Sequence, residues 1–578
     1  MRGILLVLFI HNAITNSMKR FYTILAVVVM AIFAPRAVAQ DFGGVTFNND
    51  ILTWSDIYNL SFTSHNYGTA RTMGMGNAFT ALGADLTSAT LNPAGIGMYV
   101  ESDVSFSPML QFTKTKTANS DQFYVGVPKS QQEFKDHKTN FGMSSIGGVF
   151  AAYRGTGALT NLNVGVVYNR IADFNYNTMS ASIGNPAVSS MANFLCTLSN
   201  IDNLQTNSDG TMSFGGDPYY WGATLAYENG LTNKDDQGWF IDRIADYAEI
   251  DQYSVTEVRG SLGEYDITVG MNFADIVYVG ASLGIQSLSY KRSVFYGENY
   301  IYPDNSYPSG DDMPYQLEYM NYMQRTRLSG TGINFKLGVT VRPVHWWRVG
   351  IAYHTPTFMN TSLQYGADMW SATYSAGNNP DGYNLDRDGY TYFNVGTPVW
   401  EDAGENSWNY TSPSRLLLGT AFTLGGRVIV SADYERSWYQ TMRLKSAPIW
   451  GLSYTDINKE IFKGGSTLRV GAEGYVLPFL ALRAGYIWSG NTLREGYEDI
   501  IASHIMPKSQ SYITAGVGIK FNELVYLDVA YQYGETKYTG YQTFYYTDAV
   551  NPDFDFGSRV FDDSVARHIA VVTLGLRF

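Results

Sequence analysis

Long segments of strictly alternating polarity constrain the fold of this chain more than any other feature. In residues 570–578, apolar side chains from Ala570 to Phe578 occupy every second position, and Thr573, Gly575 and Arg577 fall between them. A period of two residues is that of a β-strand. The segments run for about 10–15 residues, whereas an ordinary strand has about 5–6. This length favours strands that cross a membrane.

We predict fourteen such strands, each with one apolar face and one polar, glycine-rich face. Their ranges are 103–114, 141–154, 161–174, 258–273, 276–291, 327–342, 346–356, 414–424, 427–438, 466–476, 479–489, 509–521, 524–536 and 565–578. Residues 358–370 are a further candidate strand. Apolar faces that end in aromatic residues, as in Tyr531 and Tyr533, suit a girdle at a lipid–water interface.

The connections between these strands alternate in length. Those after even-numbered strands have 6, 2, 3, 2, 2 and 2 residues, and those after odd-numbered strands have 26, 83, 35, 57, 27, 19 and 28. Outer-membrane barrels have short periplasmic turns and long extracellular loops. We therefore expect an all-β fold in residues 101–578, a transmembrane antiparallel β-barrel with both ends in the periplasm. Its largest extracellular loops are 175–257 and 357–413.

The N-terminal region indicates export. An apolar run at 21–34 follows Lys19 and Arg20 and precedes a small-x-small cleavage pattern at 37–39, so 1–40 reads as a signal peptide with an upstream extension at 1–17. Residues 1–40 hold four basic residues and no acid, which leaves 35 basic and 52 acidic residues in the remainder. Such a balance disfavours nucleic acid as a partner. Cys196 is the single cysteine, so an internal disulfide is excluded.

Residues 41–100 precede the first strand and include a glycine-rich stretch of small residues at 69–97. Gly74 and Gly76 lack the third glycine of a dinucleotide fingerprint, which argues against a nucleotide loop. Apolar residues at 75, 79, 82 and 86 have helical spacing and predict a packed segment rather than a linker. A barrel of about 14 strands is wider than one filled by side chains and narrower than an open porin. We therefore predict that 41–100 forms a hatch in the lumen.

The sequence ARTMGMGNAFTALGADLTSATLNPAGIG at 70–97 resembles the N-terminal hatch of the FadL/TodX outer-membrane family, transporters of long-chain fatty acids and aromatic hydrocarbons. The residues that carry the resemblance are Arg71, Gly74, Gly76 and the Asn-Pro-Ala motif Asn92, Pro93 and Ala94. Phe578 matches the terminal aromatic residue of such barrels, which implies the barrel-assembly machinery as a partner. About 28 residues (41–68) precede the motif, more than in the family's transporters. Hemin receptors and shuttle proteins of type IX secretion share the same resemblance.

The resemblance also implies an apolar groove on the extracellular loops. Candidate capture residues in the loop 175–257 are Phe194, Leu195, Tyr219, Tyr220, Trp221, Trp239 and Phe240. The alternative is that these residues pack the loop onto the rim of the barrel. Residues 186–198 and 239–250 have helix-like apolar faces.

Charged residues on the predicted lumen faces form a second set of candidates. They are Arg348, Asp433, Arg469, Glu473 and Arg483. A guanidinium suits a carboxylate headgroup, but mixed charges in a lumen also pair with each other or with a hatch. His354 falls on the lumen face, so haem ligation stays open, and Asp386-Arg387-Asp388-Gly389 reads as a turn rather than a calcium loop. We expect no metal and no cofactor.

These observations predict an outer-membrane channel for passive uptake of hydrophobic molecules such as long-chain fatty acids or aromatic hydrocarbons. The molecule is captured on extracellular loops and passes a mobile hatch, in a monomer surrounded by outer-membrane lipid and lipopolysaccharide. No Gly-x-Ser-x-Gly nucleophile pattern is present, and an enzyme is not expected. The alternative is a FadL-like barrel that acts as a haem receptor or as a type IX secretion shuttle or docking protein.

Overall fold

The computed structural model describes most of the chain after residue 65. The described residues are 45–47, 66–119, 133–201, 203–206, 208, 212–213, 220–242, 244, 248–302, 315–375, 384–386, 390–393, 407–445, 459, 462–494, 509–541, 543–546 and 556–578. The expected signal peptide 1–40, most of 41–65, Tyr219 and positions 387–389 lie outside them.

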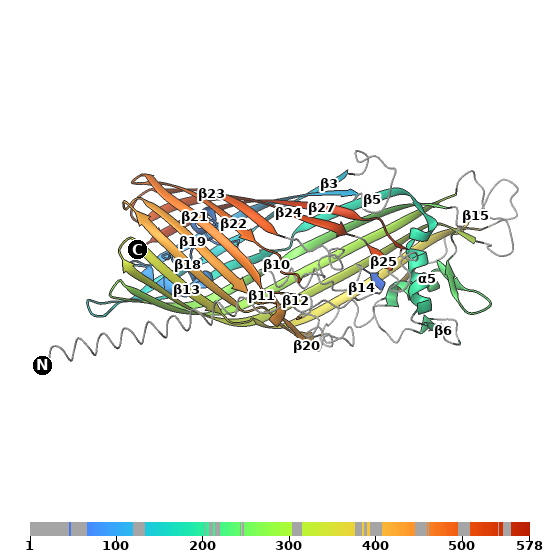
Figure 1. The fold of residues 1–578 in the computed structure, drawn as a ribbon, viewed down its shortest axis with the longest axis horizontal. Coiled ribbons are helices and arrows are strands. Elements are labelled where there is room, and N and C mark those ends of the chain that lie inside the picture. The colour runs from blue at the N-terminus through green and yellow to red at the C-terminus, as the bar shows by residue number, and fades with distance from the viewer. Residues whose placement is uncertain are drawn as a thin grey trace. The chain divides into compact units, whose positions relative to one another are not determined.

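Fourteen long antiparallel strands of the described residues close into a barrel, as the alternating segments predict (Figure 1). In order around the wall they are β2 (Asp103–Asn119), β3 (Glu133–Arg154), β4 (Leu159–Asp173), β10 (Glu249–Phe273), β11 (Val277–Ile301), β12 (Tyr315–Val344), β13 (Trp347–His354), β18 (Arg415–Leu424), β19 (Val428–Ser437), β21 (Gly465–Leu477), β22 (Leu480–Ser489), β23 (Gln510–Lys520), β24 (Val525–Tyr541) and β27 (Phe561–Arg577). The pairing of β27 with β2 closes the wall.

Two further strands lengthen the wall instead of adding to it. β5 (Tyr176–Pro186) continues β4 along β10, and β14 (Phe358–Ser375) continues β13 along β12. The candidate strand at 358–370 is therefore real, but it is the outer half of the seventh barrel strand. Three shorter strands pair with β14, namely β15 (Asn384–Asp386), β16 (Tyr390–Phe393) and β17 (Ser407–Thr411). A fourth, β20 (Arg443–Lys445), pairs with β17.

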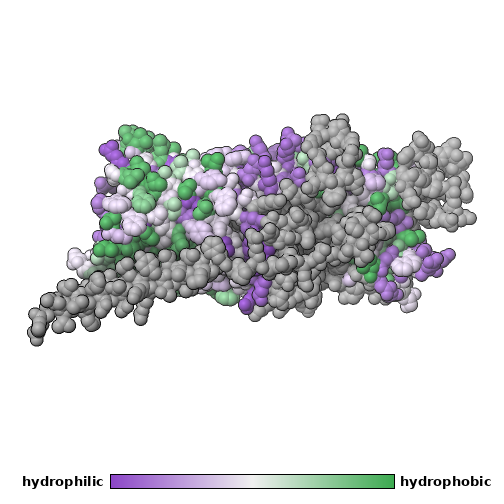
Figure 2. All heavy atoms as spheres, viewed as in Figure 1, coloured by the Kyte–Doolittle hydropathy of each residue, from purple (hydrophilic) through white to green (hydrophobic). Residues whose placement is uncertain are grey.

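The outer surface of the barrel carries an apolar belt near the short turns. Large apolar side chains are exposed there on every side of the wall, among them Phe106, Ile267 and Leu574. Figure 2 shows these hydrophobic residues gathered over one part of the barrel, with hydrophilic residues next to them. Such a belt is the surface that meets hydrocarbon in a membrane barrel. Among the described residues, no helix is long and apolar enough to span a bilayer.

Beyond this belt, the long loop after β5 folds on the extended strands. It contains η3 (Ala187–Ser189), α5 (Met191–Ile201), α6 (Trp221–Glu228) and a hairpin of β8 (Thr232–Lys234) and β9 (Phe240–Asp242). The helix expected near 186–198 is confirmed as α5. The helix-like pattern at 239–250 is wrong, because its first residues pair with β8 and its last residues begin β10. β6 (Gln205–Thr206) and β7 (Met212–Ser213) form a small two-stranded sheet. β1 (Val45–Phe47), β25 (Phe544–Tyr546) and β26 (Phe556–Gly557) form a three-stranded sheet in that order.

Residues 66–99 lie inside the barrel wall, and we call them the hatch segment. It contains α3 (Ala70–Gly74), α4 (Ser88–Leu91) and η1 (Pro93–Met98). The helical spacing at 75–86 does not produce a helix there, so that expectation is wrong. The backbone groups of this stretch bond to the wall instead, since Thr80 N donates to Asp433 at 2.7 Å and Ser431 Oγ donates to Ala78 O at 2.6 Å.

Candidate functional site

Glycines on the inner face of the wall allow the hatch segment to lie directly against the strands. A Cβ added at Gly338 would collide with the side chain of Asn92, and one at Gly471 would collide with the backbone of Met75. Other inner-face glycines that meet hatch backbone are Gly270, Gly280, Gly350, Gly419 and Gly485. The hatch side contributes Gly76, whose φ of +61° favours glycine. The polar, glycine-lined face predicted from sequence is therefore the face that receives the hatch.

The Asn-Pro-Ala motif fastens the hatch to the wall and to itself. Asn92 Nδ2 donates to Thr80 O at 2.5 Å and to Thr340 Oγ1 on β12 at 3.1 Å, while Asn92 Oδ1 accepts from Ala94 N at 3.1 Å. Asn92 is thus the N-cap of η1, and Pro93 takes the first helical position, where its missing N–H costs nothing. The motif turns the chain toward β2.

Arg71 links the hatch to a buried chain of charges. Its Nε and Nη2 each donate to the Glu473 carboxylate of β21 at 3.0 Å, a bidentate pair. Glu473 also accepts from Arg483 Nε at 2.6 Å, and Arg483 Nη1 donates to Asp528 at 2.6 Å. Glu473 and Arg483 of the wall therefore form one chain of ion pairs with Arg71 of the hatch. This is the alternative given above for mixed charges in a lumen.

The other predicted lumen charges have different surroundings. Asp433 binds the hatch through Thr80, and Arg469 Nη2 donates to Glu435 at 2.7 Å. Arg348 makes no ion pair within the described part of the chain. His354 is buried, and its Nε2 lies 2.9 Å from Leu91 O of the hatch. Whether any of these groups contacts a ligand stays a prediction.

A second buried charge cluster lies between β10 and β12, and none of its residues is among the lumen charges predicted from the sequence. Lys336 Nζ on β12 lies 2.7 Å from Glu264 and 2.6 Å from Asp266 on β10, and all three side chains are fully buried. Thr90 of the hatch donates to Asp266 at 2.6 Å, so this cluster also fastens the hatch. All three residues fall on polar faces of the predicted strands, which was the signal available.

Two cavities lie beside the hatch segment on its outer side. The first has an empty volume of about 520 Å³ and is lined by Leu262, Leu288, Leu328, Met359 and Tyr410, with His354 and Arg415 among its polar residues. The second has an empty volume of about 620 Å³ and is lined by Asn66 and Tyr67 of the hatch together with Phe174, Tyr290 and Tyr512. The first has a mainly apolar lining with a few polar groups, as small-molecule sites do, and the second is lined by polar and apolar groups in similar measure.

The loop residues predicted to capture a ligand form a buried core. Phe194, Leu195, Trp221 and Phe240 are at most 4% exposed, Tyr220 packs against them, and Trp239 is 57% exposed. The same apolar cluster continues inward to Phe174, Leu262, Leu288, Tyr290, Leu328 and Met359, which line the two cavities. A continuous apolar region therefore joins the extracellular loop to the lumen. The capture role stays a prediction and requires this core to open.

A buried glutamate on β11 positions the loop helix in this cluster. Glu298 Oε1 accepts from Met191 N, the first residue of α5, at 2.8 Å and from Tyr296 Oη at 2.5 Å. Its Oε2 accepts from Tyr300 Oη at 2.8 Å. A carboxylate at a helix N-terminus is favoured by the helix dipole, so Glu298 orients α5 over the lumen.

The wall has a seam where β3 and β4 separate. Backbone pairing between β3 and β4 runs only from Ser145↔Asn169 to Arg154↔Asn161. Above this level β3 pairs with β2 alone, and β4 and β5 pair with β10 alone. The edges of the seam are residues 136–143 and 170–177, and the second cavity lies behind the latter edge.

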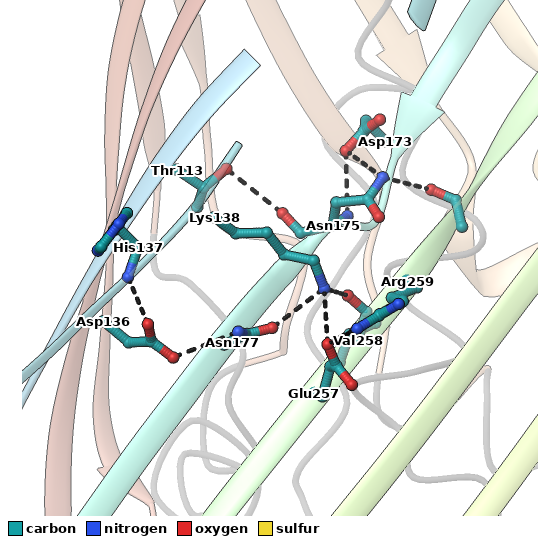
Figure 3. A network of polar contacts seen from close by, with 11 residues as sticks. Thr113, Asp136, His137, Lys138, Asp173, Asn175, Asn177, Glu257, Val258 and Arg259 are labelled. Carbon is teal, nitrogen blue, oxygen red and sulfur yellow. Dashed lines mark hydrogen bonds and ion pairs between the residues drawn. The ribbon is translucent and has the colours of Figure 1, made fainter. Parts of the chain in front are cut away.

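Side chains close this seam in place of backbone bonds (Figure 3). Lys138 reaches across from β3 and donates to Asn177 Oδ1 at 3.0 Å and to Val258 O at 3.2 Å, beside the Glu257 carboxylate at 3.3 Å. Asn177 Nδ2 donates back to Asp136 at 3.2 Å. Because such contacts are few and partly exposed to water, they are weaker than the continuous ladder elsewhere in the wall.

In the described ranges, no group of three or more His, Cys, Asp or Glu residues could hold an ion. Of the calcium-like fragment, only Asp386 lies in the described residues, where it ends β15.

The fold is similar to solved structures of transporters. The toluene transporter TodX of P. putida is 12% identical over 88% of this chain and 98% of its own, with a TM-score of 0.45. The toluene transporter TbuX of Ralstonia pickettii is 13% identical over 88% of this chain and 98% of its own, with a TM-score of 0.45. A FadL homologue of Pseudomonas aeruginosa is 14% identical over 89% and 98%, with a TM-score of 0.43. No family model and no curated protein matches the chain.

Proposed function

We propose that this protein is an outer-membrane channel for passive uptake of hydrophobic molecules, such as long-chain fatty acids or aromatic hydrocarbons. The continuous apolar cluster from Phe194 and Trp221 to the lumen cavities supports this proposal most strongly. A hydrophobic molecule gains about 25 cal/mol for each Å² of apolar surface that leaves water. It can replace apolar packing in the loop core, while opening of the core breaks the bond from Met191 N to Glu298.

A molecule in the cavities has two routes out of the barrel, and contacts must break on each of them. Passage past the hatch requires its displacement, which breaks the bonds of Asn92, Arg71 and Thr80 to the wall. Passage through the seam requires that the side-chain contacts across it separate. These are the contacts of Lys138, the bond from Asn140 to Asp173 and the bond from Arg170 to Met143 O. The seam also leads to the surface at the outer side of the apolar belt, where an apolar molecule stays out of water. We therefore favour the seam and keep the mobile hatch as the alternative route.

An uptake experiment with paired variants tests the function. Met359 lines the first cavity and is 4% exposed, whereas its neighbour Asn360 points outward and is exposed. Met359→Glu places a charge in the apolar path, and burying an unpaired charge is costly. We expect uptake of labelled oleate or toluene by a complemented deletion strain to fall at least about tenfold, equivalent to about 1.4 kcal/mol. Asn360→Glu is the matched control and should transport normally.

Two outcomes contradict the proposal. Equal uptake by the deletion strain and the complemented strain excludes transport of the tested compounds. Unchanged uptake together with mislocalised secreted proteins, or with lost growth on haem, favours a docking protein or a haem receptor instead.

A further inference from the structure

The outward face of β10, β11 and β12 is organised in rows above the apolar belt. The strand register places Tyr265, Ile285 and Ile333 side by side, and Ile267, Leu283 and Phe335 in the row below. Most of these side chains are strongly exposed, as expected where the wall meets lipid. They mark the outer edge of the belt on this side of the barrel.

Small hydroxyl residues occupy the next two rows. Ser261, Ser289 and Ser329 are direct neighbours across the three strands, and Ser287 lies opposite Thr331. All of them except the half-buried Ser261 are exposed. The rows cover four residues of each strand, which is about 13 Å along the strand at roughly 3.3 Å per residue.

Three cations form the row above the hydroxyl groups. Arg259 lies opposite Lys291, and Lys291 lies opposite Arg327. Like charges directly opposite each other destabilise a sheet. Arg259 shares the Glu257 carboxylate with Lys138, but Lys291 and Arg327 have no acidic partner among the residues that the structure describes.

Another pair of neighbouring cations in the wall does have an acidic partner, which shows that this row is unusual. Lys116 and Lys135 also lie directly opposite each other, on β2 and β3. Glu133 stands between them, at 2.6 Å from Lys116 Nζ and 2.8 Å from Lys135 Nζ. Within the described ranges, a carboxylate neutralises that pair and none neutralises Lys291 and Arg327, so an external anion is the partner that we infer.

We propose that this face binds the phosphorylated saccharide headgroup of a glycolipid of the lipopolysaccharide class. Acyl chains lie against the Tyr265 and Ile267 rows, sugar hydroxyl groups meet the serine rows, and phosphate groups meet Arg259, Lys291 and Arg327. The Arg259 row lies six residues beyond the Tyr265 row, which is about 20 Å along the strand. This interval fits a headgroup with several sugars better than a single phosphodiester. Arginine and lysine are the side chains that bind phosphate. The proposal rests on the outer-membrane location in the proposed function, but not on transport.

Binding of lipopolysaccharide to the purified full chain tests this proposal. The variant Lys291→Ser/Arg327→Ser extends the serine rows upward, and Arg427→Ser removes an exposed cation at a short turn as the matched control. We expect the double variant to bind labelled lipopolysaccharide at least about tenfold more weakly, with wild-type affinity in the control. Heat-modifiable gel mobility checks that each barrel is folded. Equal affinity of a folded double variant overturns the proposal.

Measurements on the wild type keep the proposal testable if the variant does not fold. Enzymatic removal of the phosphates should weaken binding, and added salt should do the same because exposed charges are screened. Binding that ignores both changes overturns phosphate recognition. Phosphatidylglycerol vesicles that compete as well as lipopolysaccharide overturn the saccharide part. Uptake plays no role in these readouts, so a failed transport assay leaves them interpretable.

Discussion

The hatch segment and the loop core close the same lumen by different physical means. The hatch is held by directional bonds, as at Asn92 with Thr340, and by backbone packed on glycines, as at Met75 against Gly471. The loop core is held mainly by apolar side chains such as Phe194 and Trp221, with Glu298 orienting α5. A hydrophobic ligand can substitute for apolar contacts, because they are not directional. It cannot replace hydrogen bonds to a buried amide or carboxylate without leaving these groups unpaired.

This contrast assigns different tasks to the two regions. Under the proposed function, we expect the outer region to open to an apolar molecule at a lower cost than the inner region. We therefore expect a molecule in the cavities to meet a lower barrier at the seam than at the hatch. The predictions below alter one region at a time.

Gly338→Val is expected to have the largest effect, since its new side chain collides with Asn92. Overpacking a tight contact costs about 1–3 kcal/mol or more, and here the hatch must move away from β12. We expect increased permeability to small hydrophilic solutes, measured as single-channel conductance in planar bilayers.

Gly474→Val is the matched control, because the nearest atom to its new Cβ is 4.0 Å away on the outer face. It should conduct like the wild type. A Gly338→Val channel that stays silent while folded would show that the hatch does not seal the lumen at this contact.

Arg71→Met should loosen the hatch by less. Arg71 loses a bidentate bond to Glu473, but Glu473 keeps Arg483 at 2.6 Å. Hydrogen bonds to charged groups contribute about 1.5–3 kcal/mol. Limited proteolysis of the hatch should therefore be faster in Arg71→Met, and combining it with Glu473→Gln should give a non-additive rate. Additive rates from the two substitutions would mean that this pair does not fasten the hatch.

The strands could be read from sequence only where one face meets lipid. Within the belt, outward residues such as Ile267 and Leu283 are apolar and inward residues are polar, so the period of two is clear. Above it, outward residues such as Lys291 and Arg327 meet water and inward residues such as Tyr290 pack on the loop core. The pattern reverses there, which is why the sequence does not predict β5 or the outer parts of β10–β12 and indicates β14 only as a candidate strand.

The sequence predicts which segment forms the hatch, but it does not predict which wall residues this segment contacts. Asn92, Pro93 and Ala94 mark the hatch because a short motif sets their local geometry. The partners Glu473 for Arg71 and Asp266 for Thr90 depend on register between segments hundreds of residues apart, which no local pattern encodes. The seam is likewise a missing pairing, visible only once β3 and β4 are aligned.

The smallest expected effect concerns access to Cys196, which lies on α5 and is 5% exposed. Burial raises the pKa of the Cys196 thiol well above its usual range. The reactive thiolate is thus scarce at pH 7.5, and its fraction increases as the pH rises toward that raised pKa. We expect slow labelling of the folded wild type by a maleimide, limited by opening of the loop core. An apolar ligand that opens this core should accelerate labelling several-fold, whereas Glu298→Gln, which weakens the bond to Met191 N, should accelerate it without ligand. Fast labelling of the untreated wild type at pH 7.5 would mean that the loop core is already open, and the contrast between the two regions would then fail.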